Sequence, residues 1–136
     1  MGKFGTGQAI RRVEDQRFIT GHGQYTGDIS IDGQAYLYLL RSPFAHGTIA
    51  QLDVSEARRS PGVAAVFTSR DLTDAGVRDL PGFDMPGSTL AEPRDALEQP
   101  PLARDRVHYV GEPVAGIVAD SLAAAKDAAE LIEFDV

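Results

Sequence analysis

The segment 107–136 constrains the fold most, because it reads as an ordered series of secondary-structure elements. Apolar stretches flank a Gly-Glu-Pro turn, and an alanine-rich stretch with helical spacing follows them. Gly and Pro favour a tight connection, whereas β-branched residues on either side favour extended strands. The pattern predicts, in order, a strand at 107–110, a turn at 111–113, a strand at 114–119, a helix at 121–132 and the start of a strand at 133–136.

The sequence ends at Val136, just as this last strand begins. A complete domain rarely ends at the start of a strand, because the strand's backbone groups need partners. We therefore expect the chain to be a fragment of a longer protein. The catalytic residues of such a protein can lie outside the sequence.

The rest of the chain adds three strands and a second helix. The stretch at 36–41, YLYLLR, is aromatic and apolar without alternation, which predicts a strand buried on both faces. The fold class is therefore α+β, with a mixed sheet and two helices packed on it. The predicted strands lie at 36–41, 47–54, 63–67, 107–110 and 114–119, and the predicted helices lie near 55–60 and 121–132.

The predicted helix at 121–132 has a clear start and a clear apolar face. Asp120 or Ser121 is a suitable N-cap residue, since a short polar side chain can accept a hydrogen bond from the first turn. Four apolar residues recur at helical spacing and predict the face that packs on the sheet. They are Leu122, Ala125, Ala129 and Ile132.

Two segments lack this regularity. Residues 1–20 read as an irregular, glycine-containing arm that precedes a domain at 21–136, and residues 73–101 read as a long loop rich in Pro and Gly. Neither can bury enough apolar surface alone to offset about 1–2 kcal/mol per residue of backbone ordering. We predict that both order only against a partner; the alternative for the loop is a plain surface segment.

Composition excludes several classes of function. The net charge is −7 and the basic residues are scattered, which opposes nucleic acid or an anionic membrane as a partner. The sequence has no cysteine, so disulfides and thiolate metal sites cannot form within it. It also lacks an apolar run long enough for a transmembrane helix or a signal peptide. We therefore expect a cytoplasmic protein.

The motifs of nucleotide binding, metal binding and hydrolysis are absent from the sequence. The glycines near residues 5 and 21 fail the spacing of a dinucleotide fingerprint, and no serine nucleophile elbow occurs. His22, His46 and His108 lie far apart, without the spacing of metal ligands. We expect no catalytic, cofactor-binding or metal-binding residue in this chain.

Three residues remain as candidates for an interface. Phe44 and His46 lie in the distinctive connection RSPFAHG at 41–47, and Glu112 lies in the turn between two predicted apolar strands. Phe44 and His46 can pack on a partner or cap the sheet, and packing within the domain is the favoured interpretation. Glu112 is the acidic residue with the most unusual setting, although turn residues are usually structural.

Four motifs together resemble a known family: the N-terminal α/β-hammerhead domain of the molybdenum-binding large subunit of the xanthine dehydrogenase/aldehyde oxidase family, most similar to the carbon monoxide dehydrogenase type. Their order and spacing cover nearly the whole chain. The motifs are GQAIRRVEDQRFITGHGQYTGDI at 7–29, LLRSPFAHGTI at 39–49, SEARRSPGVAAVFTSRDL at 55–72 and LARDRVHYVGEPVAGIVADSLAAAKDAAELIEFDV at 102–136.

The resemblance implies a function for a larger protein. In that family the hammerhead domain precedes a much larger part of the chain, which binds a molybdopterin-type molybdenum cofactor and supplies the catalytic glutamate. Iron–sulfur and flavin (FAD) subunits are the implied partners. This chain would be a structural and assembly domain of such an oxidoreductase, or a stand-alone, non-enzymatic interaction domain. Carbon monoxide, aldehydes and N-heterocycles all stay open as substrates.

Overall fold

The computed structural model describes residues 12–80 and 99–136. Most of the predicted loop 73–101 and over half of the predicted arm 1–20 lie outside the described residues. The chain divides into two units, Met1–Asp32 and Gly33–Val136, each described here by itself. The boundary between residues 20 and 21 stays a prediction.

The first unit contains a short helix where the sequence suggested an irregular arm. Helix α1 spans Asp15–Ile19, and a 3-10 turn, η1, spans Thr26–Asp28. Arg17 pairs with Glu14 at 2.9 Å, one helical turn away, and this spacing supports a helix. No residue of α1 is buried, so the helix rests on local interactions.

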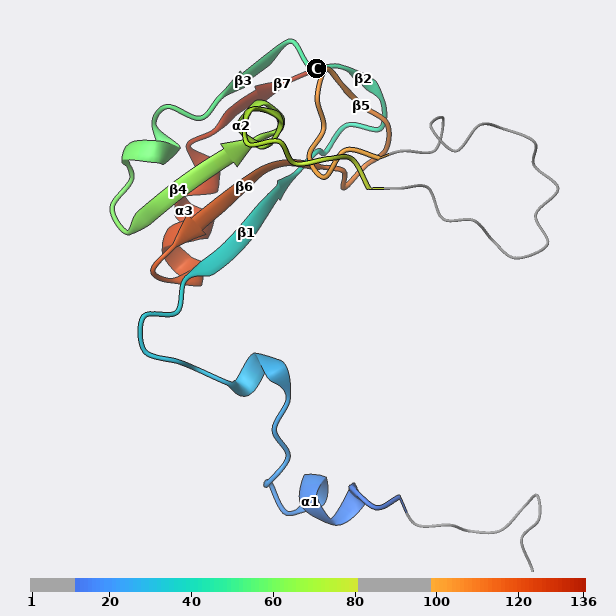
Figure 1. The fold of residues 1–136 in the computed structure, drawn as a ribbon, viewed down its shortest axis with the longest axis vertical. Helices are drawn as coiled ribbons and strands as arrows, with labels where there is room; N and C mark the ends of the chain where they lie inside the picture. Colours follow the sequence, from blue (N-terminus) through green and yellow to red (C-terminus); the bar gives the residue numbers. More distant parts are fainter. Residues whose placement is uncertain (1–11, 81–98) are drawn as a thin grey trace, which may run out of the picture. The chain divides into compact units, whose positions relative to one another are not determined.

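The main sheet of the second unit has three antiparallel strands in the order β1-β6-β4 (Figure 1). β1 spans Tyr36–Arg41, β4 spans Val63–Thr68 and β6 spans Pro113–Ala119. β6 lies in the centre, and its partners come from much earlier in the chain. The strands predicted at 36–41, 63–67 and 114–119 are confirmed almost residue for residue.

Two smaller antiparallel sheets replace the single strand predicted at 47–54. β2, Gly47–Thr48, pairs with β5, Arg106–Val107, whereas β3, Gln51–Asp53, pairs with β7, Glu133–Asp135. The chain changes its pairing partner between Ile49 and Ala50. The N–H of Ile49 donates to Asp105 O, next to β5, and the N–H of Ala50 donates to Asp135 O, in β7, each at 2.9 Å. The five predicted strands therefore do not form one sheet, and every strand pair among the described residues is antiparallel.

The strand predicted at 107–110 is wrong beyond Val107. β5 ends at Val107 and pairs with β2, while β6 pairs with β1 and β4. The residues between β5 and β6 form a hydrogen-bonded turn that redirects the chain instead of folding one strand back on the other. The α+β class itself is confirmed.

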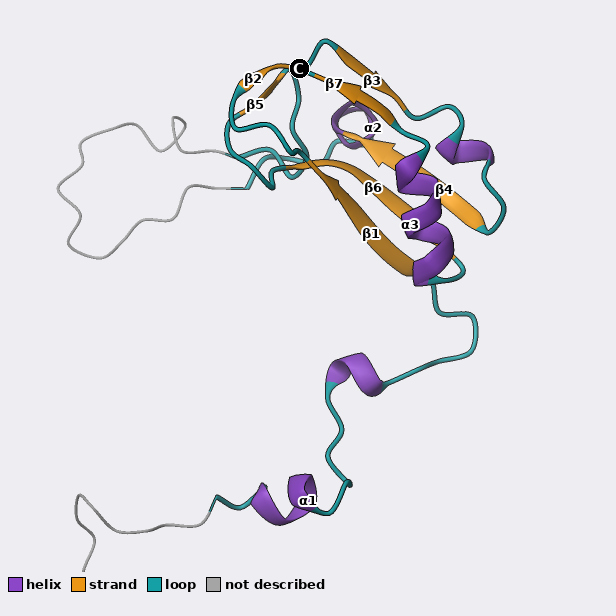
Figure 2. Cartoon of the chain, turned by 180° about the vertical axis from the view of Figure 1, so that it is seen from behind, coloured by secondary structure: helices purple, strands orange, loops and turns teal. Residues whose placement is uncertain are grey.

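Helix α3, Leu122–Glu130, covers one face of the main sheet (Figure 2). Ser121 caps it, since its Oγ accepts a hydrogen bond from the N–H of Ala124 at 3.2 Å. The predicted face is confirmed at Ala125 and Ala129, which are buried; Ile132 is also buried, but it lies beyond the end of the helix at Glu130. Leu122 is 44% exposed and does not belong to it, because it lies at the first residue of the helix.

Alanines bring α3 close to the sheet. Ala125, Ala128 and Ala129 pack with Val66 of β4 and Ile117 of β6 in the larger core cluster. Small side chains on a helix shorten the distance at which it can pack. The larger core cluster is therefore thin and lies between α3 and the sheet, while a second, smaller cluster contains Val114 of β6 with Ala103 and Val107.

The predicted two-sided burial of 36–41 is wrong for this chain. Tyr38 and Leu40 pack on the core beneath α3, whereas Leu37 on the opposite face is 60% exposed. The apolar sequence of β1 thus exceeds what the described structure buries.

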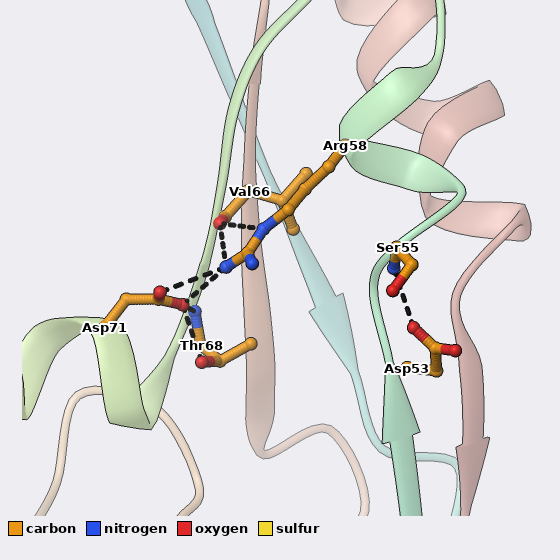
Figure 3. A network of polar contacts seen from close by, with 6 residues as sticks. All are labelled: Asp53, Ser55, Arg58, Val66, Thr68 and Asp71. Atoms are coloured by element: carbon orange, nitrogen blue, oxygen red, sulfur yellow. Dashed lines mark hydrogen bonds and ion pairs between the residues drawn. The ribbon is translucent and has the colours of Figure 1, made fainter.

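A polar network joins the elements on either side of β4 (Figure 3). The predicted helix at 55–60 is a 3-10 turn, η2, at Ala57–Arg59, and α2 spans Ser69–Asp74. The carboxylate of Asp71 accepts hydrogen bonds from the backbone N–H and hydroxyl of Thr68, at 2.7 and 2.6 Å, which caps α2. Arg58 of η2 donates to the same carboxylate at 3.0 Å and to the carbonyl of Val66 at 3.1 Å.

Two carboxylates of this region are stabilised in their charged form. The hydrogen bond from the Thr68 hydroxyl, aided by its backbone N–H and by Arg58, lowers the pKa of Asp71 below its usual value. Hydrogen bonds from Ser55 likewise lower the pKa of Asp53 (Figure 3). Both carboxylates fix turns at the ends of strands, so their roles are structural.

The described ends of the predicted loop 73–101 are held together. Leu80 and Gln99 exchange two backbone hydrogen bonds, of 2.8 and 3.0 Å, in an isolated antiparallel bridge. Arg104 forms an ion pair with Asp79 beside this bridge. The described residues on either side of 81–98, Leu80 and Gln99, therefore lie next to each other.

Candidate functional site

The connection after β1 and the turn before β6 meet in one hydrogen-bonded joint, which we call the 42/112 joint. The N–H of Ser42 donates to Glu112 O at 2.9 Å, and the N–H of Gly111 donates back to Ser42 O at 2.8 Å. Arg41 adds a side-chain hydrogen bond to Gly111 O at 2.7 Å. Gly111 has φ +91°, a conformation that glycine adopts without strain. The antiparallel pairing of β1 with β6 brings these two segments together.

Ser42 is the buried centre of the joint, with 2% of its surface exposed. Its Oγ accepts a hydrogen bond from the N–H of Phe44 at 3.0 Å and lies 3.1 Å from Phe44 O, to which it donates. The hydroxyl therefore closes a tight turn around Pro43. This role places Phe44 at a defined position after β1.

Phe44 packs partly within the domain. Its ring meets that of Phe134 edge to face, with 5.8 Å between the ring centroids, and 37% of the residue stays exposed. The edge-to-face geometry is a favourable aromatic arrangement. The interpretation of packing within the domain thus has a specific contact, while the exposed part of the ring stays available to a partner.

Glu112 is buried, with 2% of its surface exposed, and its carboxylate is fully engaged within the turn. One oxygen accepts the backbone N–H of His108, and the other lies 3.2 Å from Nδ1 of the same residue. The N–H of Glu112 donates to Tyr109 O at 3.2 Å. Glu112 therefore holds the turn 108–112 in shape from inside.

His46 and His108 lie on the exposed side of the joint. The rings are 6.0 Å apart, and Nε2 of His46 is 3.1 Å from a guanidinium nitrogen of Arg106. The third histidine, His22, belongs to the other unit of the chain. The structure thus brings together Phe44, His46 and Glu112, the three candidates named from the sequence, in one region of the domain.

Sequence reasoning missed Ser42 and Arg106. Ser42 is polar, yet it is the residue around which the joint is organised, and the Ser-Pro pair directly after a strand was the available signal. Arg106 carries no local signal, because its contact with His46 depends on the pairing of β2 with β5.

The joint presents an aromatic ring, two imidazoles and a guanidinium on its exposed side. Among residues 12–80 and 99–136, no group of three or more histidine, aspartate or glutamate side chains is placed to hold a metal ion. In the same part of the chain, every buried side-chain nitrogen or oxygen has a hydrogen-bond partner. None of the described helices is long and apolar enough to cross a membrane.

Comparison with known proteins defines the class of domain. Residues 20–135 match the family model described as the α/β-hammerhead domain of aldehyde oxidase and xanthine dehydrogenase. The chain therefore belongs to the aldehyde oxidase and xanthine dehydrogenase family, and the described structure is its hammerhead domain.

Two curated relatives show the level of similarity. The chain is 42% identical over 132 residues to the nicotine 6-hydroxylase large subunit of Paenarthrobacter nicotinovorans, covering 96% of this chain and 15% of the relative. It is 37% identical over 131 residues to the carbon monoxide dehydrogenase large chain of Afipia carboxidovorans, again covering 96% of this chain and 15% of the relative. The chain thus spans about 15% of the length of these relatives.

Solved structures agree with this assignment. Quinoline 2-oxidoreductase from Pseudomonas putida 86 superposes with a TM-score of 0.79 and 36% identity, over 95% of this chain and 16% of the other. A Cu,Mo-containing carbon monoxide dehydrogenase gives a TM-score of 0.77 and 36% identity, over 95% of this chain and 15% of the other. The expected resemblance to the carbon monoxide dehydrogenase type is confirmed.

Proposed function

We propose that this chain is a structural and assembly domain of the large subunit of a molybdenum-dependent hydroxylase. One observation carries the proposal: relatives that match the chain over 96% of its length are large subunits of which it spans 15%. The activity of such a protein would reside in the other parts of the polypeptide. The relatives' names include nicotine 6-hydroxylase and carbon monoxide dehydrogenase, so the substrate class stays open.

The described residues do not fit the role of a molybdenum site. Glu112 is engaged with His108, and His46 contacts Arg106, so no open donor set remains at the joint. We infer that a molybdopterin-type cofactor would be bound by the remainder of the large subunit. Iron–sulfur and flavin centres would lie on partner subunits, in a cytoplasmic complex.

Within that complex the 42/112 joint is a candidate contact surface. Phe44 and His46 are exposed at its edge, and Glu112 positions the turn behind them. Aromatic side chains and arginine are enriched in protein interfaces, and Arg106 contacts His46 at this edge. Phe44 and His46 would contact the partner, whereas Glu112 would stabilise the turn that positions them.

The first experiment locates the cofactor. The complete polypeptide that the gene encodes is purified beside the 136-residue chain, and both are analysed for molybdenum, iron and flavin. We expect molybdenum in the complete polypeptide and no stoichiometric metal or visible chromophore in the 136-residue chain. Stoichiometric molybdenum in the short chain, or a gene that encodes no further residues, would contradict the proposal.

The second experiment tests the joint as a contact surface. His46→Ala in the complete polypeptide should reduce co-purification of the partner subunits, and Leu122→Ala on the exposed start of α3 is the matched control. Thermal unfolding of the 136-residue chain should be the same for both variants. Unchanged subunit stoichiometry in His46→Ala would remove the joint from the interface.

A further inference from the structure

The face of the main sheet opposite α3 is apolar, and we call it the open face. Side chains alternate along a strand, so the residues between those that pack beneath α3 point to the other side. Figure 1 looks onto this face, with α3 behind the sheet, and Figure 2 shows α3 in front. The open face consists of Leu37, Leu39, Ala65, Phe67, Gly116 and Val118.

The register arranges these residues in two rows across the three strands. Leu37 and Ala65 flank Val118 in the first row, and Leu39 and Phe67 flank Gly116 in the second. Gly116 has no side chain, and an added Cβ would meet only Leu37 and Leu39, at 3.5 and 3.6 Å. The centre of the second row is therefore low, with apolar side chains on both sides of it.

Two large residues of the open face are exposed, whereas its other residues are half-buried or, at Gly116, buried. Leu37, the second residue of β1, is 60% exposed, and Phe67, the last but one residue of β4, is 41% exposed. A sheet that faces water on one side normally alternates apolar with polar residues, whereas β1 and β6 are apolar on both faces. This sequence pattern belongs to strands that are buried on both sides.

We propose that the open face is the surface by which the domain docks on the remainder of its large-subunit polypeptide. The inference rests on the proposed function and adds the location of the contact. All six residues are apolar, as in the interfaces of permanently associated units. The rest of such a polypeptide is the favoured occupant, because the chain spans only about 15% of the relatives it matches over 96% of its own length.

A cysteine-labelling experiment tests the contact, because the 136-residue chain has no cysteine of its own. Leu37→Cys and Phe67→Cys report on the open face, and Leu122→Cys, at 44% exposure, reports on the α3 side. In the 136-residue chain, the three thiols should react with a maleimide at rates within about threefold, in line with their exposure. In the complete polypeptide, labelling of the two open-face positions, read by peptide mass spectrometry, should fall at least tenfold.

Several results would overturn the inference. Protection of Leu37→Cys and Phe67→Cys in the monomeric 136-residue chain would assign the open face to another segment of the same chain. Protection that rises with concentration would assign it to a second copy. Full labelling of both positions in a complete, molybdenum-containing polypeptide would refute the docking face and leave the proposed function intact. A gene that ends at Val136 would refute both.

A charge substitution gives an independent readout. Leu37→Glu lies at an exposed position, so the 136-residue chain should unfold within a few degrees of the unsubstituted chain. In the complete polypeptide the same carboxylate would be buried, and we expect at least a fivefold loss of correctly assembled protein in gel filtration. Leu122→Glu is the control and should leave the yield unchanged. Equal yields from the two variants would contradict the docking face.

Discussion

Substituting alanine for glycine should have opposite effects at two positions of the main sheet and its turns. At Gly116 the backbone is extended and an added methyl group would make ordinary contacts, at 3.5 Å or more, with Leu37 and Leu39. At Gly62 the φ angle is +81°, and an added Cβ would lie 2.8 Å from a carboxylate oxygen of Asp120. The same chemical change therefore makes ordinary van der Waals contacts at one site and a steric conflict at the other.

The magnitudes follow from these geometries. Gly116→Ala reduces the conformational entropy of the unfolded chain, which is worth about 0.4–1 kcal/mol where the native backbone accepts alanine. The methyl group also gains some apolar contact, so we expect the free energy of unfolding to rise by about 1 kcal/mol. Gly62→Ala incurs a left-handed backbone cost of about 1–2 kcal/mol and displaces Asp120, so the free energy should fall by at least that amount.

Urea denaturation of the 136-residue chain, followed by far-ultraviolet circular dichroism, measures both variants. The denaturant slope should stay the same, so that the shift in the midpoint reports stability alone. A fall of more than about 0.5 kcal/mol for Gly116→Ala would mean that the space above this residue is already filled in the isolated chain. An unchanged midpoint for Gly62→Ala would refute the strain argument.

Substitutions at three further residues test the polar contacts of the domain. Ser121→Ala removes the cap of α3 and should lower the free energy of unfolding by about 1 kcal/mol in thermal or urea unfolding. Asp71 has a pKa lowered by Thr68, so its contribution is present above the unfolded pKa and is lost as pH falls through the folded pKa. The unsubstituted chain should therefore lose more stability than Asp71→Asn between about pH 5 and pH 2, and parallel curves for the two proteins would contradict this. Glu112→Ala leaves the turn at His108 without its buried acceptor and should cost about 2–3 kcal/mol, whereas Glu112→Gln keeps an acceptor and should cost less, as urea midpoints will show.

The strands that form the core were predictable because their signal is local. The stretch at 36–41 is strongly apolar and is bounded by Gly and Ser-Pro, so its limits coincide with those of β1. The start of α3 was equally readable, since Ser121 precedes a run of helix-forming alanines. The pairing of strands was not local, and this is where prediction failed.

The segments 47–54 and 107–110 show why strand pairing could not be predicted. Both are apolar enough to be strands, but the first divides between two partners and the second leaves its strand after Val107 and becomes a turn. The outcome is decided by contacts with residues more than fifty positions away, such as the bond from Ala50 to Asp135. The meeting of Phe44, His46 and Glu112 depends on the same long-range pairing, so residue types alone suggested the candidates but not their proximity.

The central position of β6 has a consequence for how the domain is made. β1 and β4 are synthesised first, but they do not pair with each other. Each can complete its pairing only when β6, which lies between them, has been synthesised. From the end of β4 at Thr68 to the end of β6 at Ala119, roughly fifty residues must be added, which takes about 3–10 s at ~5–20 residues per second.

During that interval two apolar strands have edges without partners, and such edges invite pairing with other chains. A ribosome that stalls between β4 and β6 would hold a nascent chain whose β1 and β4 edges are unpaired, and such a chain is prone to aggregation. We therefore expect chaperone dependence to be concentrated in this window of translation, so that slow codons would be harmful before β6 and tolerated after it.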